Sequence, residues 1–183
     1  MDTVVNVGKR NWEVNVQKTI YETRCRCTLD NLREMTANTR KTGYIIYFTI
    51  CYVVLFLFGV TIPLINDKIF MAITVLVILV MAGIFFYMMP RLNAKKQYEA
   101  YKRMCNGEEL LVKVLIFEDK IENVDTYSGK YTEIEYDHIK KIIETDNLYN
   151  LVIANGSVIM LDKREFIKGN SEECLKYIKE KVK

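Results

Sequence analysis

Five cysteines are the residues of this chain with the most obvious capacity for chemistry. Cys25 and Cys27 lie two residues apart, so on an extended segment their thiols share one face and could bind a soft metal or respond to oxidation. The alternative, which we expect, is a pair of ordinary reduced thiols. The odd number of cysteines and the absence of CxxC predict neither a disulfide framework nor a zinc site, and they favour a reducing compartment. The other three are Cys51, Cys105 and Cys174.

His138 is the only histidine. One histidine cannot form a multi-histidine metal site, and a Cys-His pair or a Ser-His-Asp triad would need partners that no motif identifies. Gly-rich phosphate loops and the HExxH, GxSxG and EF-hand patterns are missing. We therefore expect no catalytic, metal-binding or cofactor-binding residues, no cofactor and no enzymatic activity.

Seven basic residues are candidates for contacts with a membrane surface or with lipid head groups. A Lys or Arg held near an anionic leaflet contributes about 1 kcal/mol of attraction. The alternatives are a topology signal on a solvated helix face for the first five and a solvated turn for the last two. The formal net charge is only +3, which gives no electrostatic case for nucleic-acid binding. The seven candidates are Arg91, Lys95, Lys96, Lys102, Arg103, Lys163 and Arg164.

Two long apolar runs without a charged side chain interrupt the otherwise polar chain. We predict membrane-spanning helices at residues 44–65 and 69–89, each long enough for a hydrocarbon core of about 30 Å. The alternative, two buried core helices of a soluble protein, would need amphipathic faces or covering elements. Because only residues 66–68 separate the two runs, residues 43–90 should form a tight antiparallel hairpin.

Basic residues gather on one side of this predicted hairpin. The tight turn carries one Lys, whereas several Lys and Arg residues precede the first span and follow the second. The positive-inside rule then places both termini in the cytoplasm and the chain in the cell membrane as a multi-pass protein. The spans contain no Asp, Glu, Lys, Arg or His, which counts against an ion or proton path.

Residues 1–42 are predicted to hold one strand and one helix on the cytoplasmic side. Apolar and polar residues alternate over residues 12–20, which is the period of a half-buried strand. Thr28 is a suitable N-cap for the helix that follows, and Leu32 and Met35 belong to its apolar face. Because the hairpin returns the chain to the side where it entered, we expect the strand to join the C-terminal sheet.

The chain after the second span is predicted as a basic juxtamembrane helix over residues 91–109 and a β-rich domain over residues 110–183. Six short strand-like runs separated by turn residues indicate an antiparallel meander. Asn155-Gly156 lies between two of these runs and predicts a hairpin with a type I′ turn. Ser171 is the expected N-cap of a closing helix that covers the sheet.

The stretch from residue 134 to 166, IEYDHIKKIIETDNLYNLVIANGSVIMLDKREF, resembles the YcxB-like family of bacterial membrane proteins. In that family a Thr-Leu-Asp-like segment precedes two spans, as residues 28–30 do here. The family's C-terminal domain carries an aromatic-polar-Asp-Ile step and a Leu-Pro-Lys-Arg-Phe-like stretch, which are similar to residues 136–139 and 161–166. Tyr136 stands where Trp is more usual and Asp162 where Pro is, which weakens any transfer of a binding role.

The resemblance covers most of residues 28–183 and implies a pleckstrin-homology-like β-roll with a C-terminal helix, but no established biochemical activity. We therefore expect an α+β membrane protein with a two-helix transmembrane hairpin and a small antiparallel β-roll. Its expected function is that of a membrane-anchored cytoplasmic interaction or sensing module, with the lipid bilayer and an unidentified protein as partners. The alternative is a subunit of a larger membrane complex, of transport or resistance type, packed through its hairpin.

Overall fold

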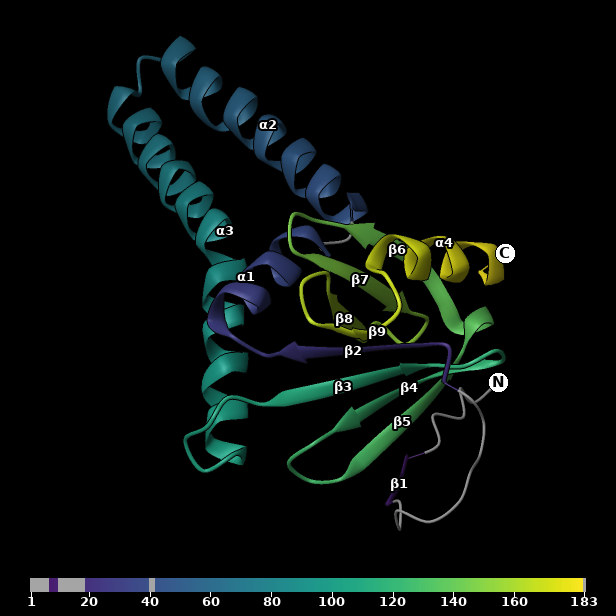
Figure 1. Cartoon of the computed structure of the whole chain (residues 1–183). Coiled ribbons are helices and arrows are strands. Elements are labelled where there is room, and N and C mark those ends of the chain that lie inside the picture. The colour runs from purple at the N-terminus through teal and green to yellow at the C-terminus, as the bar shows by residue number, and fades with distance from the viewer. Residues whose placement is uncertain (1–6, 10–18, 40–41, 183) are drawn as a thin grey trace. The chain divides into compact units, whose positions relative to one another are not determined.

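The chain forms two compact units in the computed structural model, which describes residues 7–9, 19–39 and 42–182 (Figure 1). Residues 1–39 and 94–183 make up one unit, the β-domain, and residues 40–93 make up the other, the helical unit. The described residues contain two antiparallel sheets and two long apolar helices. The predicted α+β class is therefore confirmed.

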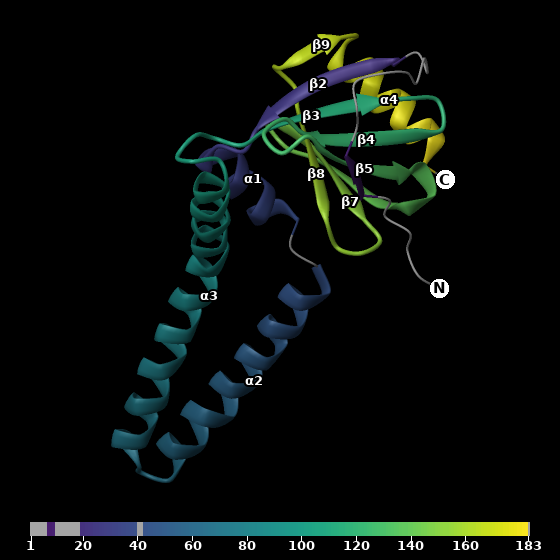
Figure 2. The ribbon, with the colours of Figure 1, turned by 90° about the horizontal axis from the view of Figure 1, so that it is seen from below.

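The strands of the β-domain form one sheet of six strands and one of three. In sheet A the order is β1-β5-β4-β3-β2-β9, and in sheet B it is β6-β7-β8, with antiparallel pairing throughout. Figure 2 shows β7 and β8 running across the direction of β3 and β4. The bounds are β1 Val7–Lys9, β2 Tyr21–Arg26, β3 Leu111–Ile116, β4 Lys120–Asp125, β5 Lys130–Glu135, β6 Ile139–Glu144, β7 Leu148–Ile153, β8 Val158–Asp162 and β9 Phe166–Lys168.

Six of these strands, β3 to β8, occupy the runs predicted from the sequence. The meander is not one sheet, however. A short 3-10 helix, η1, spans Tyr136–His138 between β5 and β6, and the chain passes from sheet A to sheet B there. A break of this kind lets two short sheets bury their inner faces against each other, which one flat meander cannot do.

The main core lies between the two sheets and beneath helix α4, Ser171–Lys181. Fully buried residues from both sheets, such as Ile116 and Leu151, share this cluster with Ile178 of α4. The N-cap of α4 is Asn170 and not the predicted Ser171, since the Asn170 side chain accepts the hydrogen bond from the backbone N–H of Glu172 at 2.8 Å. Both residue types are good caps, so sequence placed the helix start within one residue.

Two strands of the N-terminal segment, β1 and β2, pair within sheet A, and the predicted strand over residues 12–20 lies between them in the sequence. Residues 12–18 of the predicted strand fall outside the described residues, while Thr19 and Ile20 are not in a strand. Strand β2 begins at Tyr21, directly after the predicted strand, and pairs with both β3 and β9. Helix α1, Leu29–Asn38, follows and is capped by Thr28 as predicted, with Thr28 Oγ1 accepting from the backbone N–H of Asn31 at 3.1 Å.

A second buried cluster fixes α1 and the end of helix α3 to the β-domain. It contains Leu32 and Met35 of α1, Ala94 of α3 and Leu148 of β7. Cys25 and Cys27 complete it. The second apolar cluster therefore gives the N-terminal segment its own packing partners beyond strand pairing.

The two long helices are α2, Thr42–Ile65, and α3, Ile69–Met104. Both are long and apolar enough to cross a membrane, and most of their apolar side chains are exposed. The predicted second span and juxtamembrane helix are one continuous helix, because α3 runs through Pro90 to Met104. It ends where Asn106 takes a positive φ of 52° and the backbone N–H of Gly107 reaches the carbonyl of Lys102 at 2.8 Å, a Schellman-type stop.

Within the helical unit, α2 and α3 contact each other through specific pairs. The Tyr52 hydroxyl donates to the backbone carbonyl of Leu79 at 3.3 Å, and the rings of Phe48 and Phe86 stack with centroids 3.8 Å apart. Gly59 lies so close to Val75 that an added Cβ would be 2.8 Å from the valine Cγ1. Close backbone approach at a glycine is a common means of packing apolar helices.

The hairpin between β7 and β8 has a different turn from the one predicted. Gly156 has a φ of 89°, but Asn155 does not have a positive φ, so the turn is not type I′. The backbone N–H of Gly156 donates to the carbonyl of Ile153, and that of Ile153 donates to the carbonyl of Ser157. The loop is thus a three-residue connection with a left-handed glycine at its third position.

Candidate functional site: an acidic cavity of the β-domain

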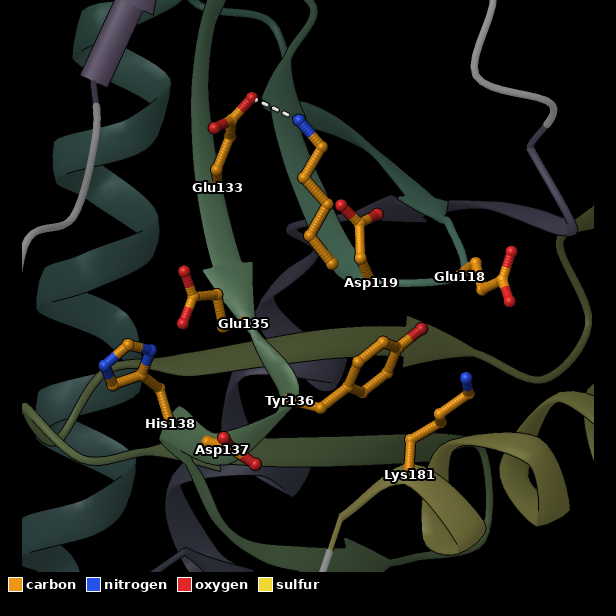
Figure 3. A pocket seen from close by; sticks show the side chains of 9 residues that line it. Glu118, Asp119, Glu133, Glu135, Tyr136, Asp137, His138 and Lys181 are labelled. Atoms are coloured by element: carbon orange, nitrogen blue, oxygen red, sulfur yellow. Dashed lines mark hydrogen bonds and ion pairs between the residues drawn. The ribbon is translucent and has the colours of Figure 1, made fainter.

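A cavity of about 630 Å³ opens where the β3–β4 turn, the end of β5, η1 and the end of α4 come together (Figure 3). We call it the acidic cavity, because five of the nine residues that line it carry a carboxylate. The nine are Glu118, Asp119, Lys120, Glu133, Glu135, Tyr136, Asp137, His138 and Lys181.

The register of β4 on β5 creates the ion pairs on one wall of the acidic cavity. Lys120 lies opposite Glu135, and Glu122 lies opposite Glu133. The Lys120 ammonium contacts Glu133 at 2.7 Å, drawn in Figure 3, and the buried Glu122 at 3.1 Å. Burial alone would lower the pKa of Lys120, but its hydrogen bonds to Glu133 and Glu122 and their charges raise that pKa above its ordinary value. The Lys120 ammonium is therefore charged and ion-paired with Glu133 and Glu122.

Tyr136 forms the floor of the acidic cavity and is itself buried. Its hydroxyl donates to the backbone carbonyl of Phe117 at 2.6 Å. Burial first, and then the neighbouring groups Tyr177, Cys174 and Asp119, raise the pKa of the phenol above its ordinary value. The group thus stays protonated and tied to the backbone, which makes it a positioning element and a poor general base.

His138 and Lys181 are the two other side chains of the cavity that can carry positive charge, and Figure 3 shows them at different ends of it. The imidazole of His138 makes no hydrogen bond to the described residues, while its backbone carbonyl accepts from Ala154 at 2.8 Å and ties η1 to the end of β7. The Lys181 ammonium lies 5.5 Å from the centroid of the Tyr177 ring. Neither residue forms a nucleophile–base pair with a described neighbour.

The chemistry that this arrangement favours is the binding of a cation. Five carboxylates face only two lysines across the lining, and Lys120 is already neutralised by two glutamates. Glu118, Glu135 and Asp137 are exposed at the rim, where they can approach a partner. In the part of the chain that the structure describes, no group of three or more His, Cys, Asp or Glu side chains is arranged to hold a metal ion.

The cysteines singled out from the sequence lie in the interior. Cys25 and Cys27 are both buried on the inner side of β2 and its continuation, and all five thiols are free. Burial, followed by the proximity of Cys105 and of acidic groups, raises the pKa of Cys27 to about 12. Burial likewise raises the pKa of Cys25. Thiols of this kind carry almost no thiolate at neutral pH and are weak nucleophiles.

The predicted basic contacts on α3 are exposed along that helix. Arg91 lies over the ring of Tyr87, with its guanidinium carbon 4.8 Å from the centroid. Lys95 approaches Glu99 at 3.8 Å, and Arg103 donates to the Glu99 carbonyl at 3.2 Å. Lys96 and Lys102 are exposed as well. These residues lie on one helix and not in a common binding site.

The two predicted contacts after β8 are engaged inside the β-domain. Lys163 donates to Glu144 at 3.0 Å and to the backbone carbonyl of Thr145 at 2.6 Å. Arg164 holds the buried carboxylate of Asp162 through two side-chain bonds of 2.9 and 2.8 Å. Both cations therefore stabilise turns, and a head group would have to compete with these internal partners.

Sequence reasoning missed the acidic cavity. Its members come from four segments, and the Glu118-Asp119 pair reads as a turn when seen alone. The one available signal was the alternation of Glu133 and Glu135 on a single strand face, which indicates a charged face but not what lies across from it. The cavity depends on β-strand register and on where α4 ends.

Comparison with known proteins finds a similarity in the C-terminal part of the chain. A family model described as YcxB-like protein matches residues 116–181, and the resemblance predicted from the sequence is confirmed there. No curated protein matches. A solved structure, the crystal structure of the C-terminal domain of an unknown protein from Leishmania infantum, is 18% identical, with a TM-score of 0.33, over 43% of this chain and 74% of that one.

Proposed function

We propose, from the premise that residues 116–181 are those of a YcxB-like protein, that this chain is a membrane-anchored, non-catalytic interaction module. Its helical unit anchors the chain in the cell membrane with both termini in the cytoplasm. Its β-domain, a pleckstrin-homology-like β-roll in this proposal, binds a basic segment of a protein partner in the acidic cavity.

The proposal of a membrane anchor rests on the exposure of apolar side chains on the helical unit. Residues of α2 such as Phe56 and Leu57 are about half exposed, and Phe70 at the start of α3 is 83% exposed. Large contiguous apolar surfaces of this kind are rare on soluble monomers. Lipid tails would cover them, and the basic residues that follow Pro90 on α3 suit a cytoplasmic leaflet.

The proposal of a basic protein partner rests on the composition of the acidic cavity. The exposed carboxylates of Glu135 and Asp137 can form ion pairs with a Lys or Arg side chain, and Tyr136 adds an aromatic ring at the floor of the cavity. A lysine-rich segment would gain several ion pairs at once, with association steered by the negative potential. The absence of a free nucleophile–base pair among the described cavity residues supports binding over catalysis.

Site-specific photocrosslinking in cells tests the proposal. A photoreactive residue placed at Asp137 should capture a protein through a Lys/Arg-rich peptide, whereas one placed at Asn155, at the exposed tip of the β7–β8 hairpin, should not. The additional substitution E135K should abolish the crosslink. A crosslink at Asp137 that survives E135K, or one to a peptide without basic residues, would contradict the role of the acidic cavity.

Two further versions of the experiment separate the anchor from the site. Replacing the helical unit with an unrelated two-helix hairpin should leave the crosslink intact, because the cavity belongs to the β-domain. If replacing the native hairpin abolishes the crosslink, the result favours the alternative, a subunit that packs on partner helices. A cysteine placed at Asp67, in the turn between α2 and α3, should react with an impermeant thiol reagent added outside the cell.

A further inference from the structure

The inner face of sheet A changes from apolar to polar along its strands. One row across the sheet, formed by Ile116, Ile121 and Ile134, is apolar and buried in the main core. The next row on the same face contains Val114, Asn123 and Thr132. An amide and a hydroxyl in the middle of such a row are unexpected in a sandwich interior, where polar groups are costly unless they are hydrogen-bonded.

At Asn123 no hydrogen bond from the described residues offsets this cost. Its Oδ1 is buried and has no hydrogen-bond partner among the described residues. The carboxylate of Asp125, two residues further along the same face, instead accepts from the backbone N–H groups of Tyr127 and Ser128. A buried acceptor without a partner among the described residues is available to a donor on a bound molecule.

The space beside Asn123 is a cavity of about 240 Å³, which we call the inter-sheet cavity. It lies at the end of the sandwich away from the all-isoleucine row, with Val112 on one sheet and Val158 to Met160 on the other. The thiols of Cys25 and Cys27 line it, and their raised pKa values keep them neutral, so they act as small apolar groups.

Size and chemistry together define the occupant. An apolar cavity of about 150 Å³ holds benzene, so the inter-sheet cavity takes a molecule somewhat larger. Seven of the twelve lining residues are apolar, counting the two neutral thiols. The other five are Tyr101, Asn123, Asp125, Lys130 and Thr132, and among them the buried Asn123 Oδ1 has no hydrogen-bond partner in the described residues. We propose that the inter-sheet cavity binds a small, neutral, mainly aromatic or aliphatic molecule that carries one N–H or O–H group, which donates to Asn123 Oδ1. This site is independent of the acidic cavity.

Indole and indene provide a matched pair of probes, because they have nearly the same shape and only indole has an N–H donor. The full chain in lipid nanodiscs, labelled with ¹³C-methyl methionine, offers Met160 in the cavity as a reporter and Met81 on α3 as a control for probe dissolved in lipid. Indole should shift the Met160 methyl in a saturable way and bind about five-fold more tightly than indene, as one net hydrogen bond predicts.

Two variants decide the assignment. N123L removes the acceptor at similar volume, so indole should fall to the affinity of indene while the fold becomes no less stable. V158F fills the cavity, so the saturable Met160 shift should disappear for both probes. The proposal is overturned if Met160 responds only linearly, as Met81 does, if N123L leaves the indole-to-indene ratio unchanged, or if a bound water alone occupies the site.

Discussion

The carboxylate of Glu34 receives two hydrogen bonds from Asn147, 113 residues further along the chain, one from the backbone N–H at 2.9 Å and one from the side-chain amide at 3.0 Å. Glu34 lies on α1 and Asn147 in the turn between β6 and β7. The pair fastens the helix that precedes α2 to sheet B. With Leu32 and Met35 in the second buried cluster, it makes α1 an integral part of the β-domain.

Substituting Glu34 with Gln should destabilise the β-domain by about 1–2 kcal/mol, because one of its two oxygens becomes an amide donor that faces the Asn147 amide. Chemical denaturation of the full chain, followed by circular dichroism, measures the change. D146N, at an exposed neighbouring position, is the matched control and should change stability by less than about 0.5 kcal/mol. Equal effects of the two substitutions would show that the Glu34–Asn147 pair contributes nothing.

Asp162 should make the β-domain sensitive to acid. Burial would raise the pKa of this carboxyl, but the hydrogen bonds and charge of Arg164, together with Asn31, outweigh it and hold the pKa below its ordinary value. A depressed folded-state pKa contributes stability above the unfolded value of about 3.9, and that stability is lost as the pH falls through the folded-state value.

The variant D162N tests this linkage. Its free energy of unfolding should be about 1.5–3 kcal/mol lower at pH 7, because charge-assisted bonds from Arg164 are lost. Between pH 5 and the acid limit it should also depend less on pH than the natural chain does. Denaturation curves over this pH range provide the measurement. Parallel pH profiles for the two proteins would rule out Asp162 as a source of the acid sensitivity.

The contact between Gly59 and Val75 should control packing in the helical unit. An added Cβ at Gly59 would lie 2.8 Å from Val75 Cγ1, so G59A should destabilise the α2–α3 contact by about 1–3 kcal/mol through overpacking. V75A removes the obstructing methyl groups, and the double variant should recover much of the loss. A double-mutant cycle on thermal stability in nanodiscs measures the coupling energy. Strict additivity would mean that the two residues do not meet.

Charge reversal at the rim of the acidic cavity should weaken binding of basic peptides. With a lysine-rich peptide as probe, E135K should raise Kd about ten-fold at low salt, and the difference should shrink as salt screens the charges. D146K changes the net charge equally but lies on the β6–β7 turn, outside the cavity lining, and should have a much smaller effect. Equal losses would indicate attraction to net charge alone.

The sequence by itself determined the features that depend on neighbouring residues. Thr28 caps α1 because its hydroxyl reaches an N–H three residues on, and apolar runs bounded by Gly, Asn and Asp marked strands β3 to β8. The two long apolar helices could also be predicted from the sequence, since the length and composition of an apolar run indicate a helix that can cross a membrane. Two local predictions were wrong: the N-cap of α4 is Asn170 and not Ser171, and the turn at Asn155-Gly156 has a positive φ at Gly156 only. Neighbouring residues of similar propensity allow either choice.

The tertiary structure alone decided which distant segments meet. Strand β9 is three residues long and is held by its pairing with β2, so nothing local marks it. The Glu34–Asn147 pair, the row that places Asn123 between Val114 and Thr132, and the walls of the acidic cavity all depend on β-strand register or on docking of α1 and α4. A register shift of one residue would turn each strand's side chains to the opposite face, and that choice is made by the energy of the whole core.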